Sequence, residues 1–81
     1  MLVRERLRSV FLTALDLPAE VNVTELQHRV HPRWDSLGHL ALVIAIEEEF
    51  DVEFDSDQLI GMDSFQSALK ILHDLGVYDS T

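Results

Sequence analysis

Apolar residues in the first part of the chain recur at the three- and four-residue steps of an amphipathic helix. Over residues 2–15 they form one stripe, which consists of Val3, Leu7, Val10, Phe11 and Ala14. Pro18 ends the pattern, because the residue before a proline is pushed out of helical geometry. The spacing therefore predicts a first helix whose stripe packs on a core.

Two later segments predict connections. Residues 16–34 form the longer one, in which Thr24 and Gln27 have the spacing of a capping box and favour a helical turn from Thr24. Residues 51–57 form an acidic loop, and the pattern predicts a short helical turn over residues 56–60.

Between these connections, the sequence predicts a helix from Ser36 to Phe50 with Asp35 as its N-cap, and this helix is apolar on two sides. At about 100° per residue, one side gathers His39, Leu42, Val43, Ile46 and Phe50. The other side gathers Ser36, Leu37, Leu40, Ala41, Ile44, Glu47 and Glu48. The first side suffices as a core face, so the second predicts an exposed apolar strip with a charged border, which is typical of a partner-binding helix. A central helix buried on both sides is the alternative.

The last helix is predicted to start at a capping-box pair, Asp63 and Gln66, and to end before Gly76. Its apolar stripe consists of Phe65, Ala68, Leu69, Leu72 and Leu75. No segment has the alternation of a strand. The sequence thus predicts an all-α fold, a small four-helix bundle with three longer helices, one short helix and a long first loop.

Charge is distributed unevenly along the chain, whose net charge is −9. Residues 1–34 carry five basic and four acidic side chains, whereas residues 35–81 carry eleven acidic side chains and Lys70 as their one base. Such a field repels nucleic-acid phosphates and anionic lipid and attracts a basic protein surface. We therefore expect neither nucleic acid nor a membrane among the partners, although solubility alone explains an acidic chain equally well.

Length and composition set further bounds. The chain has no cysteine, which excludes disulfides, thiolate metal sites and thiol nucleophiles. Its longest apolar run, residues 40–46, is far shorter than a membrane span, and the charges after Met1 do not fit a signal peptide. With 81 residues, the chain is too small for the deep pocket of a typical enzyme. We expect one cytoplasmic domain, residues 1–81, that acts as a monomer and is not an enzyme.

Ser36 is the residue with the clearest chemical potential. In the first turn of a helix, its hydroxyl lies beside unpaired backbone N–H groups and the positive end of the helix dipole, where an attached phosphate would be stabilised. A serine that only helps to cap the helix is the alternative. A hydrolase triad of Ser36, His39 and Asp35 is a weaker interpretation, because Asp35 serves better as a cap. The four histidines match no compact ligand spacing, so no metal site is expected.

The motif Asp35-Ser36-Leu37, the apolar run over residues 40–46 and the ending Glu47-Glu48-Glu49-Phe50 together resemble the acyl carrier protein family. The similarity covers nearly the whole chain. It implies that Ser36 carries 4′-phosphopantetheine, transferred from coenzyme A by a phosphopantetheinyl transferase, and that the terminal thiol of this arm holds acyl groups as thioesters. Asp35 would lie beside the phosphate and help the transferase to place its metal ion.

The resemblance also implies that the helix from Ser36 is the recognition element for acyl-loading and synthase enzymes with basic docking surfaces. The residues that would contact these enzymes are Leu37, Leu40, Ala41, Ile44, Glu47 and Glu48. A small acidic helical interaction domain without a prosthetic group would use the same strip, and this interpretation remains the rival. The two differ at Ser36, which only a carrier needs.

Two positions depart from the pattern of fatty-acid carriers. Many of these have an acidic residue directly after the triplet and another three residues later, where this chain has Gly38 and Ala41. Trp34 before the triplet and Gly38-His39 after it look more like stand-alone carriers of polyketide and other specialised pathways. The resemblance therefore favours such a pathway, and fatty-acid synthesis remains the alternative.

Overall fold

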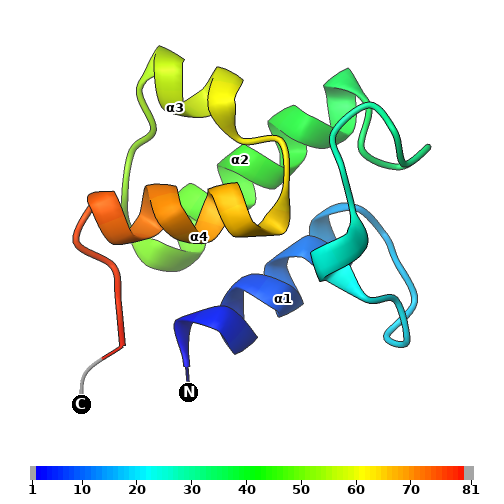
Figure 1. Ribbon diagram of the computed structural model, residues 1–81, viewed down its shortest axis with the longest axis horizontal. Coiled ribbons are helices and arrows are strands. Elements are labelled where there is room, and N and C mark those ends of the chain that lie inside the picture. The colour runs from blue at the N-terminus through cyan, green and yellow to red at the C-terminus, as the bar shows by residue number, and fades with distance from the viewer. Residues whose placement is uncertain (1, 80–81) are drawn as a thin grey trace.

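The protein is seen in a computed structural model that describes residues 2–79, and this part of the chain folds into four α-helices. The helices are α1 (Val3–Ala14), α2 (Ser36–Phe50), α3 (Ser56–Gly61) and α4 (Phe65–Asp74), with a short 3₁₀ helix, η1 (Val23–Glu25), in the long first loop. In Figure 1, α4 crosses the front, α2 runs behind it, α1 lies below and α3 lies at the top. Residues 2–79 contain no strand beyond an isolated bridge between Gln27 and Ser64. The predicted all-α bundle of three longer helices and one short helix is confirmed.

The core lies where α1, α2, α4 and the end of the first loop converge. Phe11 of α1 stands at its centre and meets two aromatic rings edge-on, Trp34 with 5.2 Å between ring centroids and Phe65 with 5.3 Å. Leu42 and Ile46 of α2 are fully buried against this cluster. Burying each such side chain stabilises the fold by about 1.5–3 kcal/mol relative to leaving it exposed, so the side chains that fix the position of α2 all lie on one side of it.

Left-handed residues terminate the three longer helices. Gly76 follows α4 with φ of 90°, and the N–H of Val77 donates to the carbonyl of Leu72 at 2.8 Å, which is a Schellman ending. The prediction that Gly76 ends the last helix is therefore confirmed. Asp16 (φ 53°) follows α1 and Asp51 (φ 54°) follows α2 in the same left-handed conformation, and short acidic side chains tolerate this conformation better than most.

The predicted cap of α4 is wrong by one residue. Ser64, not Asp63, is the N-cap, and it forms a capping box with Ser67 instead of Gln66. The backbone of Ser64 is extended (φ −156°, ψ 169°) and pairs with Gln27 in the isolated bridge, so the helix can begin only after it.

The predicted turn from Thr24 is also displaced. Asn22 is the N-cap of η1, and its side chain accepts a hydrogen bond from the N–H of Thr24 at 3.2 Å. Val23 is buried in the core, which fixes the turn there, while Gln27 pairs with Ser64 beyond the end of η1. Burial of one apolar side chain thus overrides the local capping signal.

Candidate functional site

Ser36 is the first residue of α2, and its side chain is exposed. Asp35 before it has an extended backbone and is the N-cap, since its Oδ1 accepts the N–H of Gly38 at 2.8 Å. The N–H groups of Ser36 and Leu37 have no carbonyl one turn earlier in the helix to bind. The positive end of a 15-residue helix therefore lies at the hydroxyl of Ser36.

The side of α2 that continues from Ser36 is exposed along its length. Leu37 is 79% exposed, Leu40 is 51% exposed and Ile44 is 54% exposed, and Ala41 between them is exposed as well. On the opposite side of α2, the buried residues are His39, Leu42, Val43, Ile46 and Phe50. The division into a core side and an exposed strip is therefore confirmed, and the alternative of a helix buried on both sides is wrong. We call Leu37, Leu40, Ala41 and Ile44 the apolar strip.

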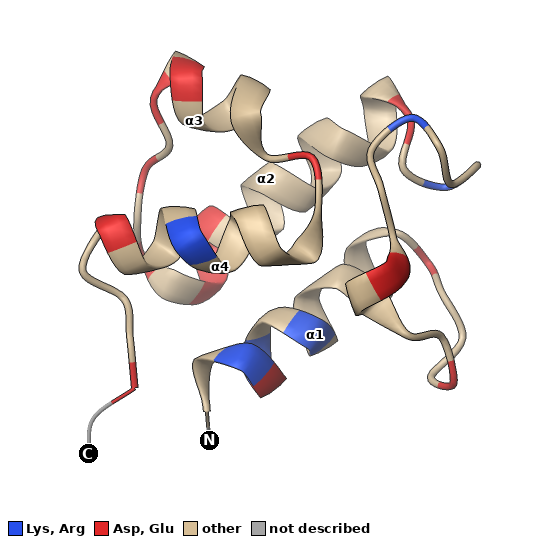
Figure 2. Ribbon diagram, viewed as in Figure 1, with Lys and Arg blue, Asp and Glu red and all other residues tan. Residues whose placement is uncertain are grey.

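The two carboxylates at the far end of the strip are placed differently from each other. Glu48 is exposed, whereas Glu47 is half-buried and its Oε2 accepts the N–H of Phe54 at 2.8 Å. Glu47 therefore also holds the loop between α2 and α3. Figure 2 shows the acidic residues of the last turn of α2 continuing into this loop, whereas the arginines lie on α1 and in the loop before α2. The strip thus ends in a strongly negative region.

A hollow of about 470 Å³ opens beside Ser36, between the first loop, α2 and α3. Its lining residues are His28, Arg29, Ser36, His39, Leu40, Leu59 and Ile60. Ile60 is 74% exposed and extends the apolar surface from α2 onto α3. Sequence reasoning missed this residue; the signal was the pair Leu59-Ile60, since a single turn with one buried side exposes one of two adjacent apolar residues.

His39 is buried in the wall of this hollow and does not face Ser36. Its Nδ1 accepts a hydrogen bond from Nε1–H of Trp34 at 2.9 Å, and its Nε2 lies 2.8 Å from the carbonyl oxygen of Leu59. These partners require a neutral imidazole with its proton on Nε2. Both nitrogens are therefore occupied, and with Asp35 used as the N-cap, the triad of Ser36, His39 and Asp35 is not formed.

His28 stacks on His39, with 4.1 Å between ring centroids and 16° between ring planes. Its Nε2 is buried without a hydrogen-bond partner among the described residues. Burial lowers the pKa of His28 below 6.5, and the neighbouring His39 and Arg29 lower it further. The two other histidines lie elsewhere: His31 Nδ1 accepts the N–H of Arg33, and His73 packs on Tyr78. No group of three or more ligands suited to a metal ion occurs among residues 2–79.

Gly38 permits a close approach of the first loop to α2. A Cβ atom at this position would lie 2.2 Å from the carbonyl oxygen of Arg33 and 3.2 Å from Cδ2 of Leu15. Any side chain would displace the loop that carries Trp34. Glycine is therefore required for packing at the position that is acidic in many fatty-acid carriers.

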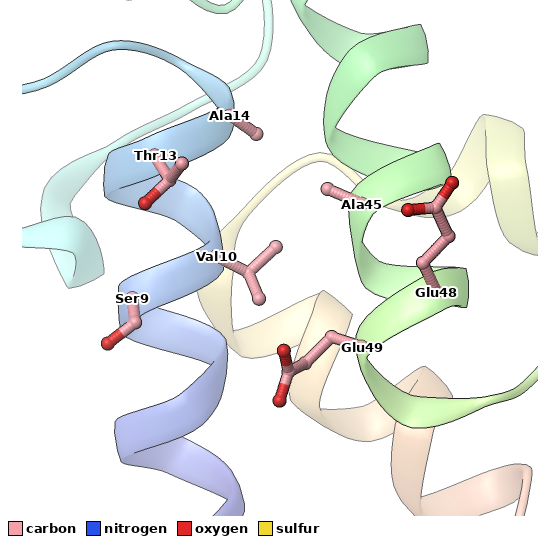
Figure 3. Close-up of a pocket in the computed structure, with 7 residues that line it drawn as sticks. All are labelled: Ser9, Val10, Thr13, Ala14, Ala45, Glu48 and Glu49. Atoms are coloured by element: carbon pink, nitrogen blue, oxygen red, sulfur yellow. The ribbon is translucent and has the colours of Figure 1, made fainter.

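On the other flank of α2, a shallow groove of about 380 Å³ runs between α2 and α1. Figure 3 shows Val10 and Ala45 at its floor, with Ser9 and Thr13 on the α1 side and Glu49 reaching across. This groove does not include Ser36, and its carboxylate Glu49 is paired with Arg6 at 2.9 Å.

No helix among the described residues is both long and apolar enough to cross a membrane.

Comparison with known proteins identifies a relative that covers most of the chain. The chain is 38% identical over 64 residues to Acyl carrier protein 3 of Ralstonia nicotianae, and the match covers 79% of this chain and 74% of that protein. No protein-family model matches the chain, and no solved structure matches it.

Proposed function

This chain belongs to the acyl carrier protein family, whose members are carriers rather than enzymes, and from that membership we propose that Ser36 is its attachment site for 4′-phosphopantetheine. The observation that carries the proposal is the place of Ser36, exposed at the first residue of α2 between the apolar strip and the hollow. When bound, the group supplies a terminal thiol that holds acyl groups as thioesters.

The residues around Ser36 fit such a group. The first turn of α2 offers backbone N–H groups and a positive dipole to a phosphodiester. Asp35, whose Oδ1 accepts the N–H of Gly38 at the same helix end, would lie beside the phosphate. The hollow gives apolar room beside the attachment point through Leu40 and Ile60.

We further propose that the apolar strip, with Glu47 and Glu48, is the docking surface for the transferase and for acyl-loading and synthase enzymes. Exposed aliphatic side chains beside carboxylates that form no salt bridge within residues 2–79 favour a partner with a basic rim and an apolar centre. A carrier must leave each enzyme after meeting it, so a small, charge-steered contact suits it better than a large dry one.

The pathway that we propose for this carrier is a polyketide or other specialised one. The tight packing of Gly38 on the carbonyl of Arg33 keeps an acidic side chain out of the first turn, and Ala41 adds none in the second. The half of α2 nearest Ser36 therefore carries no acidic side chain. We propose that residues 1–81 act as a single carrier domain in that pathway.

Intact-protein mass spectrometry tests the attachment site. The full chain is incubated with coenzyme A, magnesium and a broad-specificity phosphopantetheinyl transferase, beside the variants Ser36→Ala and Ser56→Ala. Ser56 is a matched control, because it is also an exposed serine at the first position of a helix after an aspartate cap. We expect one added phosphopantetheine on the wild type and on Ser56→Ala, and none on Ser36→Ala.

Two results would contradict the proposal. Addition to Ser36→Ala would move the attachment site elsewhere. No addition to folded wild-type protein with several transferases would favour an interaction domain that uses the apolar strip without a prosthetic group.

A further inference from the structure

The stacked pair His28 and His39 joins three segments around the hollow. His28 comes from the first loop and His39 from α2, and residue His39 is 5% exposed. Through Nδ1, His39 binds Trp34 of the loop, and through Nε2 it donates to the carbonyl of Leu59 in α3. The bond to Leu59 is the one hydrogen bond that links α3 directly to α2 within residues 2–79.

Apart from this link, α3 has little buried surface to attach it to the bundle. None of its six residues is fully buried, whereas each of the other α-helices buries at least three residues. Leu59 is half-buried and Ile60 is mostly exposed. The capping box of Asp55 and Gln58 stabilises the turn itself and does not attach it to the bundle. Helices with few buried contacts open most readily.

Protonation is incompatible with the observed contacts. A second proton on His39 would occupy Nδ1, which could then no longer accept the N–H of Trp34. A proton on Nε2 of His28 would have no acceptor in the described structure, and it would add a charge against the face of His39.

The charged groups around His28 have opposite effects on its pKa. Arg29 disfavours a cation at His28, whereas Asp35 and Asp63 favour it, and burial has the largest effect, so that the pKa of His28 is lowered. The closed arrangement therefore binds fewer protons than an arrangement in which the ring of His28 reaches water and its pKa returns towards 6.5. By linkage, closure is fully favoured above pH 6.5 and weakens as the pH falls below it.

We propose that the His28–His39 pair is a pH-sensitive contact that holds α3 against α2 at neutral pH and releases it when an imidazole is protonated. Release would widen the hollow beside Ser36, because Leu59 and Ile60 form its α3 wall. The proposal concerns the folded chain itself and holds whether or not Ser36 carries a prosthetic group, so its test uses unmodified protein.

Amide hydrogen exchange tests the proposal on the full chain. Protection factors, corrected for the intrinsic pH dependence of exchange, are measured at Leu59 and at Leu72 of α4 between about pH 7.5 and about pH 5.5. One histidine that is protonated only in the open state increases opening by up to roughly tenfold over this range. We expect protection at Leu59 to fall about five- to tenfold, with protection at Leu72 unchanged.

Three variants test whether His28 and His39 cause the pH dependence of protection at Leu59. His39→Gln can still accept from Trp34 and donate to Leu59, and His28→Phe keeps a ring on the stack, so the double variant should retain α3 and lose its pH response. His73→Gln is the matched control, because His73 is exposed and packs on Tyr78. Constant protection at Leu59 in the wild type, or a full pH response in the double variant, would overturn the proposal.

If the double variant does not fold, NMR of the histidine resonances in the wild type tests the proposal instead. We expect His39 to show a proton on Nε2 at neutral pH and the amide of Leu59 to titrate together with His28. An amide of Leu59 that instead titrates with His73 would overturn the proposal.

Discussion

The two sides of α2 carry the same kinds of aliphatic side chain in very different surroundings. Leu42 has no exposed surface and packs against the core, whereas Leu40, two positions earlier, keeps half of its surface exposed at the edge of the hollow. Residue type therefore does not separate the stabilising positions from the proposed recognition positions, but helical phase does. The comparison suggests that stability and docking can be changed independently on one helix.

The largest expected effect is the difference in stability between the variants Leu42→Ala and Leu40→Ala. Leu42→Ala should lower the free energy of unfolding by about 2–5 kcal/mol, since it removes core contacts and leaves a cavity. Leu40→Ala should change it by less than about 0.5 kcal/mol, as is usual for surface positions, while slowing modification of Ser36. Chemical denaturation and transferase kinetics measure the two effects. Equal losses of stability in both variants would contradict the division into two sides.

Gly38 lies at the border between the two sides, and its replacement should have the next largest effect. Gly38→Ala gains about 1 kcal/mol of helix propensity but places a Cβ 2.2 Å from the carbonyl oxygen of Arg33. We expect a net loss of about 1–3 kcal/mol and altered fluorescence of Trp34, the one tryptophan of the chain.

Gly61→Ala is the control for Gly38→Ala. A Cβ at Gly61 would meet no atom within 4 Å, so this variant should be neutral or up to about 1 kcal/mol more stable. A Gly38→Ala protein that is also more stable than the wild type would show that the loop yields easily.

A smaller effect should distinguish the charged end of the strip. Glu48→Lys should lower kcat/KM of the transferase by about three- to tenfold at low salt, because a charge at the rim of an interface acts mainly on the association rate. Asp74→Lys makes the same charge change on α4, at an exposed residue, and should have little effect. The difference should shrink at high salt. Equal losses in both variants would indicate that net charge alone matters.

The smallest expected effect concerns ionic strength. Seven acidic residues lie between Glu47 and Asp57 without a basic residue among them, and of these Glu49 is paired with Arg6. Added salt or magnesium should raise the melting temperature by weakening their mutual repulsion. Glu53→Gln, at an exposed position, should reduce this dependence. A melting temperature that does not change with salt would contradict the prediction.

Periodicity predicted the parts of the molecule that local physics determines. The core side of α2 was predicted residue by residue, because a 15-residue helix with a strong cap keeps its phase along its length. The cap of α4 was misplaced, because Asp63 and Ser64 are both good capping residues. The bridge of Ser64 to Gln27, a residue distant in sequence, decides between them.

The surroundings of Ser36 were less predictable. Its exposure at the start of α2 follows from sequence, but the contact of His39 with Trp34 and Leu59 brings together a loop and two helices. No local pattern encodes such a contact. From its sequence position, Glu47 was likewise expected to be a surface carboxylate. Its side chain instead accepts the N–H of Phe54, because the loop between α2 and α3 bends back onto α2.

The close fit of Gly38 under the carbonyl of Arg33 also bears on attempts to re-engineer this carrier for other enzymes. Adding a carboxylate at Ala41 requires only space that already exists, since that residue is exposed. Adding one at position 38 would require the preceding loop to be rebuilt as well. Converting the surface to a more acidic type is therefore a two-step design problem, in which the loop must be remodelled before the helix can accept the new side chain.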